Sequence, residues 1–289
     1  MNDSTTFRWL GAAGIELKKN GQVLVVDPYL TRFPIWKLWW VRVAPDRVRI
    51  AEKFRGCDFA LVTHAHFDHI MDVPDLIRDT GATAFGSANS CQLLAACGVP
   101  ENKIRQIVTG DRLAVGCFQV EVRGAAHMGI PGFGSGPLAA SLKPPLRARD
   151  YRMDNCGSFL ITVDGLRLLT DPGRQPGDAA PADVLLVYPG LEAGYYEALL
   201  SVVRPQVVVP IHWDDLFHPS SDPIRPFWQP PRWACPPLKR IDLLEFRRRI
   251  ERAVPGTRVL APEVFCDYDL GEFRAGKIAS KDSYWNIVK

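Results

Sequence analysis

The feature that most constrains this chain is a cluster of metal-ligand side chains directly after a short apolar run. Residues 59–62 read Phe-Ala-Leu-Val, a run typical of a buried strand, and the next seven residues read Thr-His-Ala-His-Phe-Asp-His. The cluster places three imidazoles and one carboxylate within six positions, those of His64, His66, Asp68 and His69. These donors are enough to begin the coordination of two adjacent metal ions. The fold must therefore hold the end of this strand rigid and leave it open to a ligand.

Three further strand-like runs also end in a residue that can bind a metal ion. They are the alternating run 118–122 before His127, the run 166–170 before Asp171 and the run 206–211 before His212. Catalytic groups gather on loops at one end of a sheet, because the sheet fixes them while the loops stay accessible. We therefore expect the four runs to bring their ligands together at one edge of the fold.

Short turn and helix signals outline the remaining elements. An Asn-Gly pair at 20–21 joins the run 7–17 to the run 22–26, and an Asp-Gly pair at 164–165 predicts a second tight hairpin. Helices are predicted over residues 74–80, 90–97, 193–203 and 242–253. The patterns on either side of these signals alternate between strand and helix periods, which is typical of an α/β protein.

The order of strands followed by helices occurs twice, in about 1–125 and in 156–289. This order predicts a four-layer αββα sandwich, two mixed sheets flanked by helices, formed as a single domain over residues 1–289. Residues 129–152 are rich in Gly and Pro and are expected to form a lid or binding loop. Residues 29–43 form an aromatic-rich insertion.

Composition and charge exclude several classes of function. The chain of 289 residues is 47% hydrophobic and carries a formal net charge of +3, too mild to predict a nucleic-acid partner. We find no signal peptide at the start and no apolar run long enough to span a bilayer. The seven cysteines contain no C-x-x-C pair, which favours reduced thiols in a cytoplasmic protein.

The ligand motifs and their order resemble those of the metallo-β-lactamase superfamily. The resemblance implies that His64, His66 and His127 hold one metal ion, that Asp68, His69 and His212 hold a second, and that Asp171 bridges the two. It covers residues 61–213 through the ligand motifs. Class B β-lactamases of this superfamily lack the bridging carboxylate, so Asp171 argues against that activity.

A Trp-Leu-Gly at 9–11 and a Val-Val-Asp-Pro at 25–28 resemble one branch of the superfamily. That branch includes ascorbate-6-phosphate lactonase and, more distantly, the N-acyl-phosphatidylethanolamine phospholipase D enzymes. This chain has Ala12 where the branch often has His, and Thr-Asp-Pro-Gly at 170–173 in place of Gly-Asp-Thr. Neither departure removes a ligand, and both leave the substrate open.

The ligand set predicts hydrolysis with two divalent metal ions as cofactors. Zinc is the expected metal, with manganese and iron as alternatives. Two such ions supply hydroxide near neutral pH and polarise a carbonyl or phosphoryl oxygen, while Asp68 or Asp171 passes a proton to the leaving group. The expected substrate is a small or amphiphilic ester, a lactone or a phosphodiester. A di-iron redox enzyme and a non-catalytic binding module on the same fold are the alternatives.

Two surface segments are candidates for substrate binding. Trp36 and Trp40 in the aromatic insertion are expected to form an apolar wall, and Arg147 and Arg149 to hold an anionic substrate. The simpler interpretations are aromatic side chains packed on the core and solvated charges. The tryptophans equally suit a lipid surface or a second subunit, so peripheral membrane contact and a homo-oligomer both stay open. Asp27, before Pro28, is interpreted as a turn residue near the site.

Overall fold

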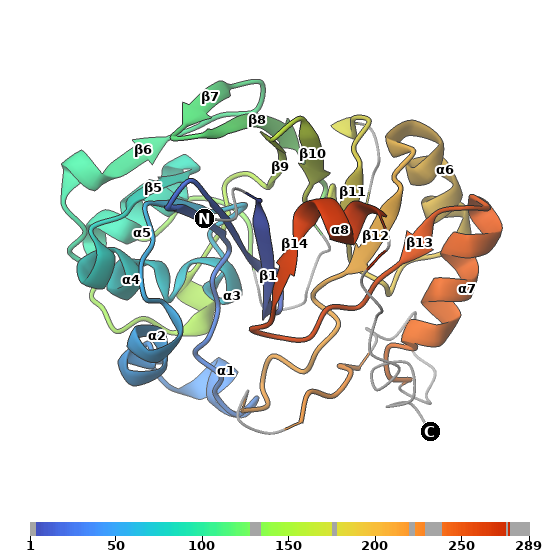
Figure 1. Ribbon diagram of the computed structural model, residues 1–289. Helices are drawn as coiled ribbons and strands as arrows, with labels where there is room; N and C mark the ends of the chain where they lie inside the picture. The colour runs from blue at the N-terminus through green and yellow to red at the C-terminus, as the bar shows by residue number, and fades with distance from the viewer. Residues whose placement is uncertain are drawn as a thin grey trace.

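Two seven-stranded mixed sheets face each other, and helices cover their outer sides (Figure 1). The computed structural model describes residues 4–127, 134–174, 178–219, 223–228, 239–275 and 277. The predicted αββα sandwich is confirmed. Because each sheet buries one face against the other and one against helices, the central strands are apolar on both faces.

The first sheet has the strand order β14-β1-β2-β3-β4-β5-β6. Its strands are β1 Thr6–Gly11, β2 Gly14–Lys19, β3 Gln22–Val26, β4 Phe59–Leu61, β5 Thr83–Gly86, β6 Ile104–Gln106 and β14 Asp267–Asp269. The second sheet has the order β13-β12-β11-β10-β9-β8-β7. Its strands are β7 Arg112–Val115, β8 Phe118–Gly124, β9 Gly157–Val163, β10 Leu166–Leu169, β11 Val184–Val187, β12 Val207–Pro210 and β13 Arg258–Val259.

The helices follow the predicted order, with short additions. They are α1 Lys37–Trp40, α2 Arg47–Lys53, α3 Phe67–Ile70, α4 Val73–Thr80, α5 Ala88–Ala96, α6 Ala193–Val203, α7 Leu243–Ala253 and α8 Leu270–Ala275, with 3-10 turns η1 Glu101–Lys103 and η2 Ala148–Asp150. Local sequence explains their ends: α4 stops at left-handed Gly81, and the side chain of Asp242 caps the start of α7.

Each sheet changes from antiparallel to parallel pairing partway across, at β3 in the first sheet and at β10 in the second. In the first sheet β1, β2 and β3 pair antiparallel, and β3 to β6 pair parallel. In the second sheet β7 to β10 pair antiparallel, and β10 to β13 pair parallel. The strands β4, β10 and β12 each have a parallel partner, so their carboxyl ends lead into loops rather than hairpins, which leaves room for functional side chains.

Both predicted hairpins are confirmed, and a third reversal was missed. Asn20 and Gly21 have φ of 51° and 75°, and Asp164 and Gly165 have 52° and 72°, as a two-residue hairpin turn requires. The run 7–17, predicted as one side of the first hairpin, divides into two strands, because the chain reverses between β1 and β2. Ala12, with φ of 46°, lies in that reversal. Its conformation depends on distant contacts described below, which a local pattern does not reveal.

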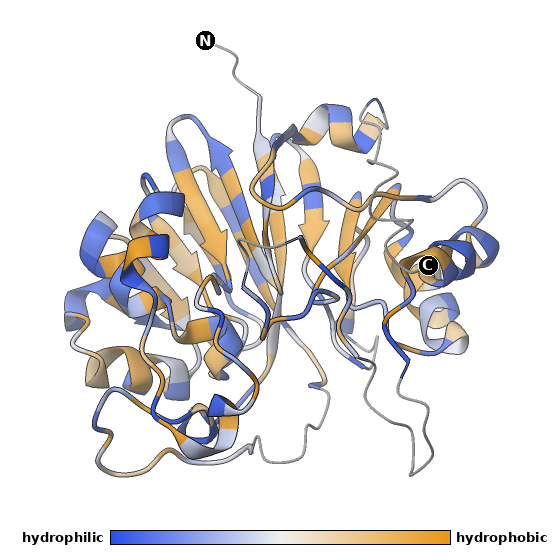
Figure 2. Cartoon of the chain, turned by 90° about the horizontal axis from the view of Figure 1, so that it is seen from below, coloured by the Kyte–Doolittle hydropathy of each residue, from blue (hydrophilic) through white to orange (hydrophobic). Residues whose placement is uncertain are grey.

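Two apolar clusters fill the layers. The larger joins the inner faces of both sheets with α6 and α7, and the smaller joins the first sheet with α2, α4 and α5. Figure 2 shows the strands mainly in the hydrophobic colour and the outer helices in both colours. The sheets are thus held rigid on both faces, which fixes the strand ends that carry the ligand loops.

The predicted lid and the aromatic insertion contain little regular structure. Of residues 129–152, the first five lie outside the described residues, and the rest form a loop with only η2 as a regular element. Its function as a lid stays a prediction. The aromatic insertion forms α1, a single helical turn. Within the described ranges, no helix is long and apolar enough to cross a bilayer.

Candidate metal centre

Three histidine rings converge at the ends of β4 and β8. The ring centroids of His64 and His66 are 4.7 Å apart, those of His64 and His127 are 4.7 Å apart, and those of His66 and His127 are 4.6 Å apart. One nitrogen from each ring lies within 4.8 Å of the other two. We call these three residues the histidine group. The structure thus brings together the residues that the motif order assigns to one ion.

Burial keeps the histidine group neutral. It lowers the pKa of His64 and His66 below the usual range, and burial together with His66 lowers the pKa of His127 to about 3. Neutral imidazoles keep the lone pair that a metal ion needs. The Nε2 atom of His64 is buried and has no hydrogen-bond partner among the described residues. A metal ion would satisfy this atom, so the group fits a cation.

A second group combines a carboxylate with two histidines. Asp68 and His69 lie on α3, and His212 follows β12. The Oδ2 atom of Asp68 is 3.1 Å from Nε2 of His212 and 3.6 Å from Nε2 of His69. We call these residues the mixed group; their three donor atoms also lie within 4.8 Å of one another. The rings of His64 and His69, one from each group, are 3.9 Å apart, so the groups are neighbours.

Mutual attraction sets the charges in the mixed group. Burial alone would raise the pKa of Asp68, but His69 and His212 hold it well below the usual range. Burial alone would lower the pKa of His69, but the carboxylates of Asp27 and Asp68 raise it. Asp68 also lies in the first turn of α3, where the helix dipole favours an anion.

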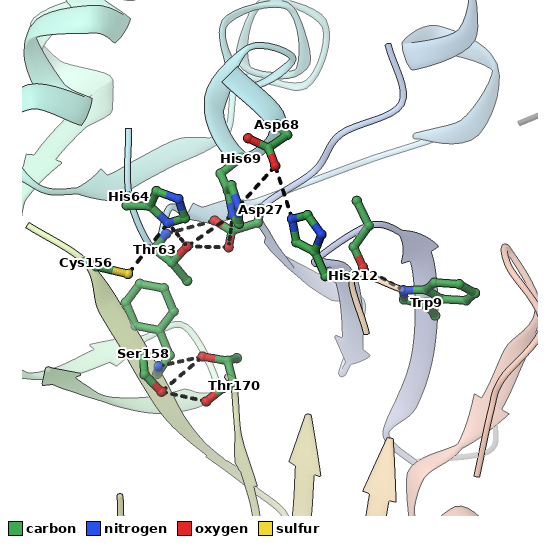
Figure 3. Close-up of polar contacts among 12 residues, drawn as sticks. Trp9, Asp27, Thr63, His64, Asp68, His69, Cys156, Ser158, Thr170 and His212 are labelled. Carbon is green, nitrogen blue, oxygen red and sulfur yellow. Dashed lines mark hydrogen bonds and ion pairs between the residues drawn. The ribbon is translucent and has the colours of Figure 1, made fainter. Parts of the chain in front are cut away.

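Asp27 and Thr63 fix the orientation of one ring in each group (Figure 3). The Oδ2 atom of Asp27 is 2.8 Å from Nδ1 of His69 and accepts the hydroxyl proton of Thr63 at 2.5 Å. Since that hydroxyl has only one proton, its oxygen accepts from Nδ1 of His64 at 3.1 Å. Both rings therefore direct Nε2 away from this support, as histidines backed by a carboxylate network do in metal sites.

Asp171 faces the same cavity from the end of β10. Its Oδ1 accepts the backbone N–H of Gly173 at 2.8 Å, and its Oδ2 accepts that of Tyr188 at 3.1 Å. Burial raises the pKa of Asp171. Asp171 lines the cavity with both groups but belongs to neither set of converging donor atoms. Its role as a bridge between two ions stays a prediction.

Close backbone contact places the loop of His127 beside that of Asp171. The backbone N–H of Arg174 donates to the carbonyl of Ala126 at 2.7 Å, and Ala126 pairs with Gly173 in a parallel bridge. Gly173 has φ of 73°, and a Cβ atom there would clash with the backbone of Ala126. Only glycine allows this approach, so Gly173 is a requirement of the site.

His212 is held by a buried contact between the two halves of the chain. Its backbone N–H donates to the carbonyl of Ala12 at 2.8 Å, and the N–H of Ala12 donates to Oδ1 of Asp214 at 2.9 Å. Nη2 of Arg32 donates to Oδ2 of Asp214 at 2.8 Å, and both side chains are only 3% exposed. Ala12 and His212 both have positive φ, at 46° and 58°. The hydrogen bonds among Arg32, Asp214, Ala12 and His212 offset the strain of these two backbone conformations and set the direction of His212.

The two groups and Asp171 line one cavity of about 130 Å³. Its remaining walls include Cys156, Arg174, Tyr188, Leu191 and Ile211. The Sγ atom of Cys156 is 3.8 Å from Nδ1 of His64, and burial raises the pKa of this thiol to about 12, so it is protonated. Sequence reasoning missed these wall residues and the roles of Thr63 and Asp27. Asp27 follows β3, and Thr63 lies just after β4, the parallel partner of β3. These two adjacent positions were the available signal for their roles.

The four predicted substrate-binding residues lie elsewhere. Trp36, Trp40, Arg147 and Arg149 are absent from the cavity lining. Trp40 is exposed on α1, and Trp36 is exposed at the N-cap of that helix. Arg147 is the N-cap of η2. The structure does not bring them to the ligand groups: α1 and η2 pack against each other, and Trp36, Trp40 and Arg149 are exposed to solvent. Their contact with substrate stays a prediction.

Comparison with known proteins agrees with the fold and the motifs. A family model described as "Beta-lactamase superfamily domain" matches residues 23–188, more than half of the chain. A "UPF0173 metal-dependent hydrolase" of Carboxydothermus hydrogenoformans is 28% identical over 217 residues, which is 71% of this chain and 83% of that protein. A protein of the same description from Symbiobacterium thermophilum is 29% identical over 210 residues, again 71% and 83%.

Solved structures show the same fold at low identity. The metallo hydrolase Igni18 from Ignicoccus hospitalis has a TM-score of 0.58 and 19% identity, over 92% of this chain and 97% of that one. The metallo-β-lactamase fold protein YhfI from Bacillus subtilis has a TM-score of 0.56 and 11% identity, over 92% and 100%. The superfamily prediction is confirmed, and the resemblance to the lactonase and phospholipase branch stays a prediction.

Proposed function

The chain belongs to the β-lactamase superfamily, and we propose that it is a metal-dependent hydrolase that cleaves an ester-type bond with two divalent ions. The observation that carries this proposal is the meeting of two ligand groups in one cavity. His64, His66 and His127 would hold one ion, and Asp68, His69 and His212 the other, with Asp171 between them. Zinc suits this set of imidazoles and carboxylates, as do manganese and iron. When bound, two such ions lower the pKa of a water molecule and polarise a carbonyl or phosphoryl oxygen.

Asp68 is the residue that we propose to carry a proton to the leaving group. Both oxygens of Asp171 accept backbone N–H groups, which fixes that carboxylate. The described contacts of Asp68 with histidine use Oδ2 alone. Its other oxygen is therefore the better placed to receive a proton and pass it on. In this scheme Asp171 would help to position the two ions and balance their positive charge.

The walls of the cavity support a small or amphiphilic anionic substrate. Arg174 lines the cavity and is exposed, so its guanidinium can meet a substrate's negative charge at the rim. Leu191, Ile211 and the ring of Tyr188 supply apolar surface in the same lining. Tyr195 and Tyr196 on α6 hold these walls by donating to the carbonyls of Gly173 and Tyr188. A lactone or a phosphodiester with an acidic group suits this arrangement.

A hydrolysis screen of the metal-loaded protein tests the proposal. We expect turnover of at least one member of a panel of phosphodiesters, lactones and acyl esters, lost on chelation and restored by the metal. Replacing Arg174 by Ala should raise KM for an acidic substrate about tenfold and leave a neutral analogue nearly unchanged. Absence of hydrolysis across the panel, with tightly bound iron whose absorbance changes on reduction, would contradict the proposal in favour of redox chemistry.

A further inference from the structure

Exposed apolar side chains gather on one part of the surface, away from the metal cavity. Five large ones lie within residues 35–48: Ile35 at 47% exposure, Trp36 at 57%, Trp39 at 44%, Trp40 at 77% and Val48 at 70%. We call these five the aromatic face. In the rest of the described chain, large exposed apolar side chains occur only singly, at Val108, Val202 and Trp228. A concentration of this kind marks a surface that binds a protein, a membrane or a ligand.

The exposure of the tryptophans is a consequence of how α1 is anchored. Leu38 is the one side chain of this helix that is buried, and Val43 is buried just after it. Both belong to the apolar cluster beneath the first sheet. With these two as anchors, a single helical turn directs its tryptophans outward. Figure 1 shows α1 and α2, which carry the face, next to each other at the lower edge of the molecule.

Positive charge surrounds the aromatic face. Residues 35–55 contain six basic and two acidic side chains, and residues 143–149 contain three basic and no acidic ones. The two segments are adjacent, because Nη1 of Arg42 donates to the carbonyls of Lys143 and Pro145 at 2.8 Å each. The backbone N–H of Val43 also donates to the carbonyl of Leu146 at 2.8 Å. These segments together hold more net positive charge than the +3 of the whole chain.

The acidic groups near the face do not cancel this charge. With Asp150, which directly follows the second segment, those of the two segments number three against nine basic side chains. Asp46 accepts the backbone N–H of Arg49 as the cap of α2, and Asp75, on α4, pairs with Arg47, whose side chain is still 72% exposed. Lys37 lies 5.6 Å from the ring centroid of Trp36. Lys143 and Arg149 are exposed. Tryptophan rings beside cations are the composition that proteins present to the boundary between lipid and water.

We propose that the aromatic face docks reversibly on an anionic lipid bilayer. Tryptophan rings would enter the headgroup layer, and the surrounding Lys and Arg side chains would meet acidic headgroups. A second copy of the chain fits less well. A two-fold dimer would place this positive surface against itself, and like charges brought together oppose association. The inference is independent of the bond that the metal centre cleaves.

Sedimentation with vesicles tests this proposal. We expect the full chain to bind vesicles of phosphatidylcholine mixed with phosphatidylglycerol, and to bind pure phosphatidylcholine vesicles much more weakly. The double variant W36S/W40S should lose binding by about tenfold or more. The variants Lys143→Gln and Arg149→Gln should each weaken it by about fivefold, and added salt should reproduce their effect. Val108→Ser, at an exposed apolar residue outside the aromatic face, is the matched control and should bind vesicles like the wild type.

Two results would overturn the proposal. One is equal sedimentation of the wild type and W36S/W40S when both show the same thermal unfolding, which places the lipid contact elsewhere or nowhere. The other is a wild-type dimer in light scattering that W36S/W40S converts to a monomer, without vesicle binding by either protein. That result would assign the face to a second copy of the chain.

Discussion

His64, His66 and His127 form a group of neutral rings, whereas Asp68, His69 and His212 form a group in which a carboxylate already pairs with two histidines. The first group lies at the ends of β4 and β8 and includes a buried Nε2 atom with no hydrogen-bond partner in the described structure. The second has its donor atoms joined at 3.1 and 3.6 Å through Oδ2 of Asp68. The two groups share one cavity and one supporting network.

The difference teaches which part of the centre depends on an ion. A buried nitrogen without a partner costs free energy, so the histidine group gains most when a cation arrives. The mixed group satisfies itself without one, and a cation there must replace existing contacts. We therefore expect chelation to disturb the histidine group and to leave the mixed group in place.

Removing Asp171 tests whether the groups act as one centre. Asp171→Ala takes away the carboxylate that lines the cavity with both groups. The activation free energy should rise by several kcal/mol, which is a loss of about 10³-fold in kcat/KM. Steady-state assay of the best substrate from the hydrolysis screen measures this. Asp79→Ala, on the exposed side of α4, is the control and should keep full activity. Activity within tenfold of the wild type for Asp171→Ala would mean that one group suffices.

Two histidine variants separate the groups in chelated protein. His212→Ala removes the partner at 3.1 Å from the buried carboxylate of Asp68 and should lower the free energy of unfolding by about 2 kcal/mol. His127→Ala removes a neutral ring from the other group and should cost about 1 kcal/mol or less. Urea denaturation of both chelated variants makes the comparison. Equal losses would contradict the claim that only the mixed group is held together by its own contacts.

Asp72 shows what happens to a buried carboxylate without the histidines that surround Asp68. Burial raises its pKa to about 6, although Oδ2 accepts the backbone N–H groups of Leu30 and Thr31 at 2.5 and 2.8 Å. The folded state then holds the proton more tightly than the unfolded chain. Stability is therefore greatest below about pH 4 for this group and falls by about 3 kcal/mol as the pH rises through 6. Asp72→Asn should remove this fall, measured as the difference between the two proteins in denaturant midpoints from pH 4 to 7. An identical pH profile for both would refute the assignment.

Asp27→Asn tests the support behind the mixed group. The change keeps the shape and the left-handed backbone of residue 27 but weakens the acceptor for Nδ1 of His69. Metal affinity should fall by about 10- to 100-fold at one of the two sites, because support of this kind tunes the ligand. Isothermal titration of the chelated variant with zinc should show one weakened and one nearly unchanged site. Equal weakening of both sites would show that Asp27 acts through Thr63 on the whole centre.

Much of the fold and of the ligand set follows from local sequence. The histidine cluster is tied to β4, and the runs before His127, Asp171 and His212 became strands β8, β10 and β12. Functional side chains gather on loops at one end of a sheet, so the position of each ligand just after a strand predicts that the ligands converge. The two hairpins also came from local turn residues, since Asn-Gly and Asp-Gly accept positive φ.

The missed features depend on contacts between distant parts of the chain. The reversal at Ala12 and the direction of His212 rest on Arg32 and Asp214, which are 182 positions apart. Arg174 reaches the cavity because Gly173 lets its loop pack against Ala126. No periodicity in a single segment reports such contacts. Trp36 and Trp40 were predicted to contact substrate from composition alone, and the structure places them outside the cavity.

Metal stoichiometry is the most direct test of the central claim that two ligand groups form one dinuclear centre. The chain would be chelated, reloaded with zinc, dialysed and analysed by plasma mass spectrometry beside His66→Ala and His212→Ala. We predict two zinc ions per wild-type chain and one in each variant. One ion or none in the wild type, or two in either variant, would contradict the account.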